Sequence, residues 1–112
     1  MTDIEQFLFG GNMAHGIVEF SLAPGRIRLG LAPWETGGVH PNLSTEAVFV
    51  NSKILWLWQI EEPDEEDLNL PWDIIGLDGY VLQGGRWKFV LNCGGIELGW
   101  ESEWPRVKRG VA

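Results

Sequence analysis

The chain has 112 residues, a formal net charge of −8, and 16 acidic side chains against 8 lysines and arginines. Apolar residues make up 45 % of it, which excludes a disordered chain and is enough for one buried core. The composition does not shift along the chain, so we expect a single domain over residues 1–112. Acidity of this size repels phosphate backbones, and we therefore expect no nucleic-acid partner.

The N-terminal sequence, the lengths of the apolar runs and the single cysteine predict the cellular location. The N-terminal stretch MTDIEQFLFGG carries acids and no basic region, unlike a secretory signal peptide. No apolar run approaches the roughly 18 residues that a membrane helix needs. Cys93 has no second cysteine to pair with, so an internal disulfide is excluded. These features predict a cytoplasmic protein without a membrane partner.

The first elements in chain order are a short helix and a β-hairpin. Thr2-Asp3-Ile4-Glu5 has the spacing of a capping box, and Gly10-Gly11 should end the helix that begins there. Apolar residues then recur at every second position over residues 16–22 and again over residues 26–32. Ala23-Pro24-Gly25 separates the two runs, and this pattern predicts two antiparallel strands joined by a tight turn.

The middle of the chain predicts a loop followed by more strands. Residues 32–45 are rich in glycine and proline, so we expect a long loop there. Between Ala47 and Ile60 one parity is apolar except at Ser52, which fits either one long strand or two strands turning at Asn51-Ser52; its members are Val48, Val50, Ile54, Trp56, Trp58 and Ile60. Further strands are expected around residues 73–77 and 80–82.

The C-terminal third carries the clearest hairpin. Apolar residues alternate with others over residues 87–91 and 96–101, and the glycine-rich Asn92-Cys93-Gly94-Gly95 connects them. Trp104-Pro105 should end the ladder, since proline has no amide proton to donate. The whole pattern predicts an all-β, mainly antiparallel protein. We expect a small sandwich or curved half-barrel of about seven strands, with a short N-terminal helix.

The sequence offers little of the chemistry that an enzyme or a metal site requires. Cys93 stands in a turn, and His15 and His40 are remote from it in sequence, so no nucleophile motif is formed. These three residues also lack the spacing of zinc ligands. EF-hand registers starting at Asp64 or Asp67 place Asn69 or Trp72 at unsuitable positions. We therefore expect a non-enzymatic protein with no metal and no cofactor.

Seven tryptophans are more than a chain of this length needs for its core. Alternation places four of them on core faces: Trp56, Trp58, Trp87 and Trp100. The remaining three, Trp34, Trp72 and Trp104, could stack on sugar rings. A small-ligand or carbohydrate-binding β module is therefore an alternative function.

The most unusual segment follows Ile60 and places six acids in seven positions: Glu61, Glu62, Asp64, Glu65, Glu66 and Asp67. One interpretation is a solvated loop that keeps a sheet protein soluble and protects an exposed edge. The other is a partner-binding surface, because Trp72 lies close behind the acids as an aromatic anchor. Such a surface, made of the six acids and Trp72, would attract a basic protein.

The C-terminal part also resembles a known family. The residues concerned are the strand entry Gly85-Arg86-Trp87 with Phe89, the turn at Cys93, and the ending that runs from Glu97 through Glu101 and Glu103 to Trp104-Pro105. Over residues 72–107 the chain is similar to small immunity proteins of bacterial polymorphic toxin systems. The resemblance implies a cytoplasmic, non-enzymatic inhibitor that binds a cognate toxin domain and blocks its active site.

Overall fold

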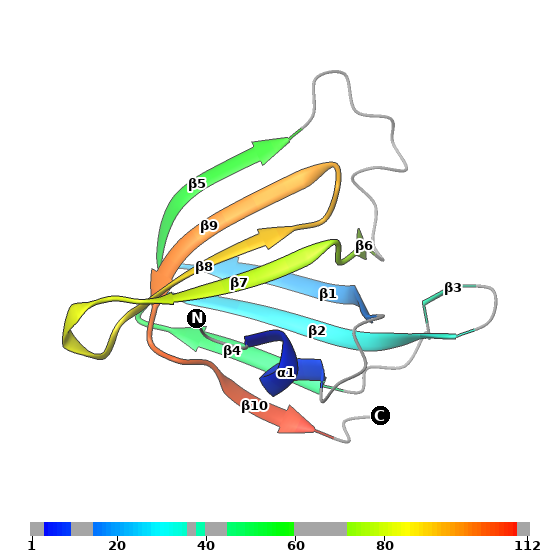
Figure 1. The fold of residues 1–112 in the computed structure, drawn as a ribbon, viewed down its shortest axis with the longest axis horizontal. Coiled ribbons are helices and arrows are strands. Elements are labelled where there is room, and N and C mark those ends of the chain that lie inside the picture. Colours follow the sequence, from blue (N-terminus) through cyan, green and yellow to red (C-terminus); the bar gives the residue numbers. More distant parts are fainter. Residues whose placement is uncertain (1–3, 10–14, 36–37, 40–44, 60–71, 110–112) are drawn as a thin grey trace.

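The computed structural model describes residues 4–9, 15–35, 38–39, 45–59 and 72–109. Within them the chain forms two antiparallel sheets packed face to face, with one short helix, α1 (Ile4–Phe9), beside them (Figure 1). An all-β sandwich with a short N-terminal helix is therefore confirmed. Thr2, the expected helix cap, lies outside the described residues. No helix in the described part of the chain is long and apolar enough to cross a membrane.

The larger sheet has the strand order β10-β4-β2-β1-β6, with β3 paired to β2. Its strands are β1 (His15–Ala23), β2 (Arg26–Glu35), β3 (Gly38–Val39), β4 (Thr45–Val50), β6 (Trp72–Asp73) and β10 (Arg106–Arg109). The predicted first hairpin is confirmed, because β1 and β2 pair across the turn that contains Pro24. A register shift between Ile17 and Glu19 turns Ile17 rather than Val18 into the core.

The smaller sheet has the order β5-β9-β8-β7. Its strands are β5 (Lys53–Gln59), β7 (Gly76–Val81), β8 (Trp87–Asn92) and β9 (Ile96–Ser102). The predicted C-terminal hairpin is confirmed as β8 and β9, and the Cys93 amide donates to the Ile96 carbonyl in its turn (2.9 Å). The four strands fan across the upper half of Figure 1, with β5 at the outer edge.

The segment from Ala47 to Ile60 resolves into two strands that belong to different sheets. Asn51 adopts a φ of 53°, the left-handed conformation that reverses the chain between β4 and β5. The Ser52 amide then donates to the Gly25 carbonyl of the first hairpin turn (3.0 Å). The shared parity was therefore misleading: in β4 it is Ala47 and Phe49 that are fully buried.

The core lies between the sheets and forms one cluster of buried side chains. Phe49 of the larger sheet meets Phe89 and Trp100 of the smaller one, with ring centroids 5.0 and 4.9 Å apart in edge-to-face geometry. Helix α1 adds the buried Ile4 and Leu8 to this cluster.

A second set of contacts holds α1 in place. Its carbonyls at Phe7 and Leu8 accept hydrogen bonds from the Arg109 guanidinium of β10. These contacts satisfy acceptors that a helix of this length leaves unpaired at its C-terminal end.

Two local expectations were wrong, and a third, that Trp104-Pro105 ends the ladder, is confirmed. Residues 32–35 continue β2 and pair with β3, so the glycine- and proline-rich stretch begins as a hairpin extension. The two strands expected around residues 73–77 and 80–82 are instead the short β6 and the longer β7. Pro105 does end the smaller sheet, yet the chain crosses over and adds β10 to the larger one. The described residues hold ten strands where about seven were expected.

Candidate functional site

The six acids of the predicted partner-binding surface, residues 61–67, lie outside the described residues. Trp72, its aromatic member, is described. It pairs with Ile17 as part of β6, and its ring lies 5.1 Å from that of Phe20. The ring is half-buried, and its Nε1–H has no hydrogen-bond partner in the part of the chain that the structure describes. Trp72 therefore contributes largely to packing, and only part of its ring is open to a partner.

The strand that leads into the acidic segment is the more conspicuous feature. β5 ends at Gln59, immediately before residues 60–67, and it is an edge strand whose only strand neighbour in the described structure is β9. Because nothing pairs with its other side there, one row of backbone amides and carbonyls faces outward. An edge of this kind can accept an additional strand.

The side chains of β5 make this edge apolar. Leu57 is 60 % exposed and Trp58 is 53 % exposed, and Ile54 and Leu55 are also exposed. Leu57 stands opposite the buried Leu98, on the core side of the sheet, but the larger sheet does not cover it. Trp58 stands opposite Glu97 on the other face. The expected core position of Trp58 was therefore wrong, because a register shift between Ile54 and Trp56 reverses the alternation in β5 and puts Trp58 on the outer face.

Trp56 fixes β5 to the rest of the sheet. It stands opposite Gly99 on the outer face, where its Nε1–H donates to a carboxylate oxygen of Glu97 (3.0 Å). The Lys88 ammonium lies over the Trp56 ring, 5.4 Å from its centroid, and 5.8 Å from the centroid of Tyr80. Trp56 is thus half-buried on the outer face of the sheet rather than in the core, where alternation placed it.

The other tryptophans with a predicted role lie elsewhere. Trp100 is fully buried, as predicted. Trp87 and Trp104 are partly buried, pack against the core cluster and contact each other with centroids 4.9 Å apart. Trp104 is therefore poorly placed to stack on a sugar. The side chain of Trp34 is outside the described part of the structure.

A small apolar cleft opens between the two sheets beside β5. It has a volume of about 100 Å³, and its walls include Phe20, Leu57, Trp72 and Leu98. Cys93 also borders it, and burial raises the pKa of its thiol to about 12, with a smaller contribution from the Asp73 carboxylate. A nucleophilic cysteine needs the opposite shift, so this thiol is not activated.

The described residues contain no group of three or more His, Cys, Asp or Glu side chains that could hold a metal ion. The exposed β5 edge is the candidate functional feature that the sequence reasoning missed. One signal was available: residues 54–58, Ile-Leu-Trp-Leu-Trp, are apolar at consecutive positions, which fits a strand buried on both faces or one offered to a partner.

Comparisons with known proteins give no relative from which a function could be transferred. No family model matches the chain, and neither curated proteins nor solved structures give a significant match.

Proposed function

We propose that this protein is non-enzymatic and acts by binding another protein, as an immunity protein that neutralises a cognate basic toxin domain in the cytoplasm. The observation that carries the proposal is the β5 edge, whose outer backbone groups pair with no other strand among the described residues and which carries the exposed side chains of Leu57 and Trp58. A long apolar edge is an aggregation hazard for a protein that works alone. The same edge is compatible with a protein that functions in a complex, where a partner covers it.

Charge supports the choice of a basic partner. β5 runs directly into the six acids of residues 61–67, so the apolar edge and the acidic segment are consecutive in the chain. Dense negative charge next to an apolar anchor accelerates encounter with a cationic protein, while the anchor slows dissociation. The resemblance of residues 72–107 to toxin-immunity proteins points to the same class of partner.

The experiment that tests the proposal identifies whether the reading frame immediately upstream encodes a protein with a toxic C-terminal domain, and measures complex formation with that domain. Replacing Leu57 and Trp58 together by serine should weaken the complex by about thirtyfold or more, since such anchors contribute about 2 kcal/mol or more. The matched control replaces Tyr80 and Val81, which are 47 % and 67 % exposed on the opposite edge strand β7, by serine. Equal affinities of the two variants would reject β5 as the contact edge.

A second candidate function is a carbohydrate-binding β module, and the exposure of Trp58 favours it. An indole that is open to solvent beside Glu97 offers a stacking surface next to a hydrogen-bond acceptor for sugar hydroxyls. Titration of the protein with a set of glycans, followed by tryptophan fluorescence, separates the two functions. Quenching that disappears in Trp58→Ala would favour the module, and its absence would favour the protein partner.

A further inference from the structure

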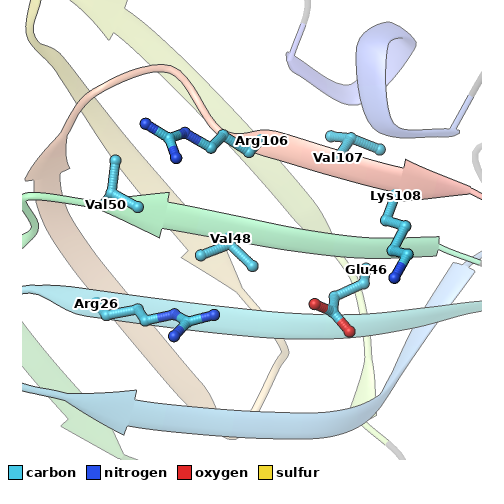
Figure 2. Close-up of a pocket in the computed structure, with 7 residues that line it drawn as sticks. All are labelled: Arg26, Glu46, Val48, Val50, Arg106, Val107 and Lys108. Atoms are coloured by element: carbon cyan, nitrogen blue, oxygen red, sulfur yellow. The ribbon is translucent and has the colours of Figure 1, made fainter.

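The outer face of the larger sheet carries a shallow basic groove of about 400 Å³ that the proposed function does not use. Figure 2 shows its arrangement: Arg106 and Lys108 project from β10, Val48 and Val50 lie on β4, and Arg26 projects from β2. The strand register places Arg106 beside Val48 and Arg26 beside Val50. Two rows of cations therefore flank a strip of half-buried valines.

The charge of this basic groove is opposite to that of the chain. Four of the chain's 8 lysines and arginines lie on this face: Arg26, Arg28, Arg106 and Lys108. Among the described residues, two carboxylates pair with one of these cations, Glu19 and Glu46, so the four cations exceed them by two in a protein whose net charge is −8. A local inversion of this kind is a binding feature rather than a consequence of composition.

Within the described residues, only one of the four cations is neutralised by close partners. Arg28 donates to Glu19 (3.2 Å) and to Glu46 (2.9 Å). The hydrogen bond from Arg28 is the main reason that the pKa of Glu46 lies below its usual value, so this carboxylate stays charged and closes one end of the groove. Among the described residues, Arg26, Arg106 and Lys108 form no ion pair and are exposed to solvent.

We propose that the basic groove binds an extended acidic peptide segment of a partner protein, independently of the β5 edge. Neighbouring strands lie about 4.8 Å apart, so the cations on β10 and β2 are about 10 Å apart across β4. Along each of these strands, alternate residues repeat at about 6.7 Å. An extended run of acids has the same repeat. In such a peptide, successive carboxylates would point alternately toward the cations of β10 and those of β2. The peptide backbone would lie over the valines of β4.

Other anions fit this groove less well. Within a sheet the backbone amides point at neighbouring strands, so none is available on the face to cradle a free phosphate. A nucleic acid would need many more cations to offset its repulsion from a chain of net charge −8. The half-buried valines add an apolar surface that a peptide can cover and a small inorganic anion cannot.

The test measures the binding of fluorescein-labelled hexaglutamate by fluorescence anisotropy, with hexaglutamine as the uncharged peptide control. The groove variant combines Arg26→Gln, Arg106→Gln and Lys108→Gln. We expect the intact protein to bind hexaglutamate, to lose most of that affinity between about 0.02 M and about 0.3 M salt, and to ignore hexaglutamine. The groove variant should bind hexaglutamate at least about tenfold more weakly.

The matched control removes the same amount of charge from the smaller sheet, with Lys53→Gln, Arg86→Gln and Lys88→Gln. Its affinity for hexaglutamate should fall by no more than about twofold, because none of these cations lines the groove, which lies on the larger sheet. Near-ultraviolet circular dichroism establishes that both variants keep their tertiary structure.

Four results would overturn the proposal. An equal loss in both variants would mean that only net charge matters. Tighter binding of an oligothymidylate of equal charge would assign the groove to nucleic acid. Displacement of hexaglutamate by an equal concentration of orthophosphate would assign it to a simple anion. A dimer of the unliganded protein that dissociates only in the groove variant would assign it to a second copy of the chain.

Discussion

Replacing Gly99 with alanine is expected to detach Trp56 from the outer face of the smaller sheet. A Cβ atom at Gly99 would lie 2.5 Å from the Cε2 and Cζ2 atoms of the Trp56 ring and 2.6 Å from its Cη2 atom. Carbon atoms do not approach this closely, so the indole must move outward. Its hydrogen bond to Glu97 and its contact with Lys88 would then be lost.

The loss of stability caused by Gly99→Ala can be estimated from the contacts that Trp56 would lose. The hydrogen bond to a charged acceptor contributes about 1–2 kcal/mol, and the partly exposed cation–π contact contributes about 0.5–1 kcal/mol. Lifting the half-buried ring off the sheet removes about 1 kcal/mol of apolar contact. The alanine itself stabilises the strand by about 0.5 kcal/mol, because a glycine weakens a strand interior. Gly99→Ala should therefore lower the free energy of unfolding by about 2–3.5 kcal/mol.

Urea unfolding followed by far-ultraviolet circular dichroism measures this change without depending on tryptophan emission. The control is the same substitution in a Trp56→Ala background, where no ring opposes the new methyl group. There Gly99→Ala should be neutral or slightly stabilising, giving a coupling energy of about 2 kcal/mol between the two positions. An equal loss of stability in both backgrounds would refute the reasoning, since the methyl group would then act on the backbone alone.

Trp100→Ala should lower the free energy of unfolding by about 3–5 kcal/mol, because this side chain is fully buried, whereas Trp58→Ala should change it by less than about 1 kcal/mol. The reverse order in urea titrations would contradict the placement of β5. The Cys93 thiol, whose pKa burial raises to about 12, should react with an aromatic disulfide reagent at about pH 8 at least tenfold more slowly in the native protein than in urea; equal rates would show that it is not protected. Asn51→Val should cost about 1–2 kcal/mol and Asn51→Gly much less, since only the former is strained at a φ of 53°. Similar melting temperatures of these two variants would argue against the left-handed turn.

The parts of the fold that the sequence predicts well are those in which neighbours in the chain are neighbours in the sheet. Both hairpins, β1–β2 and β8–β9, have a short glycine-containing turn between two runs of period two, and local turn chemistry sets their register. Trp100 could be placed in the core for the same reason, since β9 is flanked by strands on both sides.

The parts that could not be predicted depend on which sheet a strand joins. The same parity is apolar before and after the turn at Asn51, with Ser52 as the interruption, so parity alone cannot reveal that β4 and β5 belong to different sheets. Trp58 is exposed because the register shift between Ile54 and Trp56 puts it on the outer face of the smaller sheet, and this irregularity in the pairing with β9 cannot be read from the local pattern. β10 was missed because Pro105 correctly ends one ladder while the strand after it joins the other.

The central claim, that the acidic segment and the β5 edge together receive a basic protein, is tested most directly by association kinetics. The six acids of residues 61–67 would be replaced by glutamine and asparagine, and binding of the upstream-encoded toxin domain followed by stopped-flow fluorescence over a range of salt concentrations. Steering by these carboxylates predicts an association rate at least about tenfold lower at low salt, with a flattened salt dependence and an unchanged melting temperature. An association rate equal to that of the native protein at every salt concentration would contradict the claim.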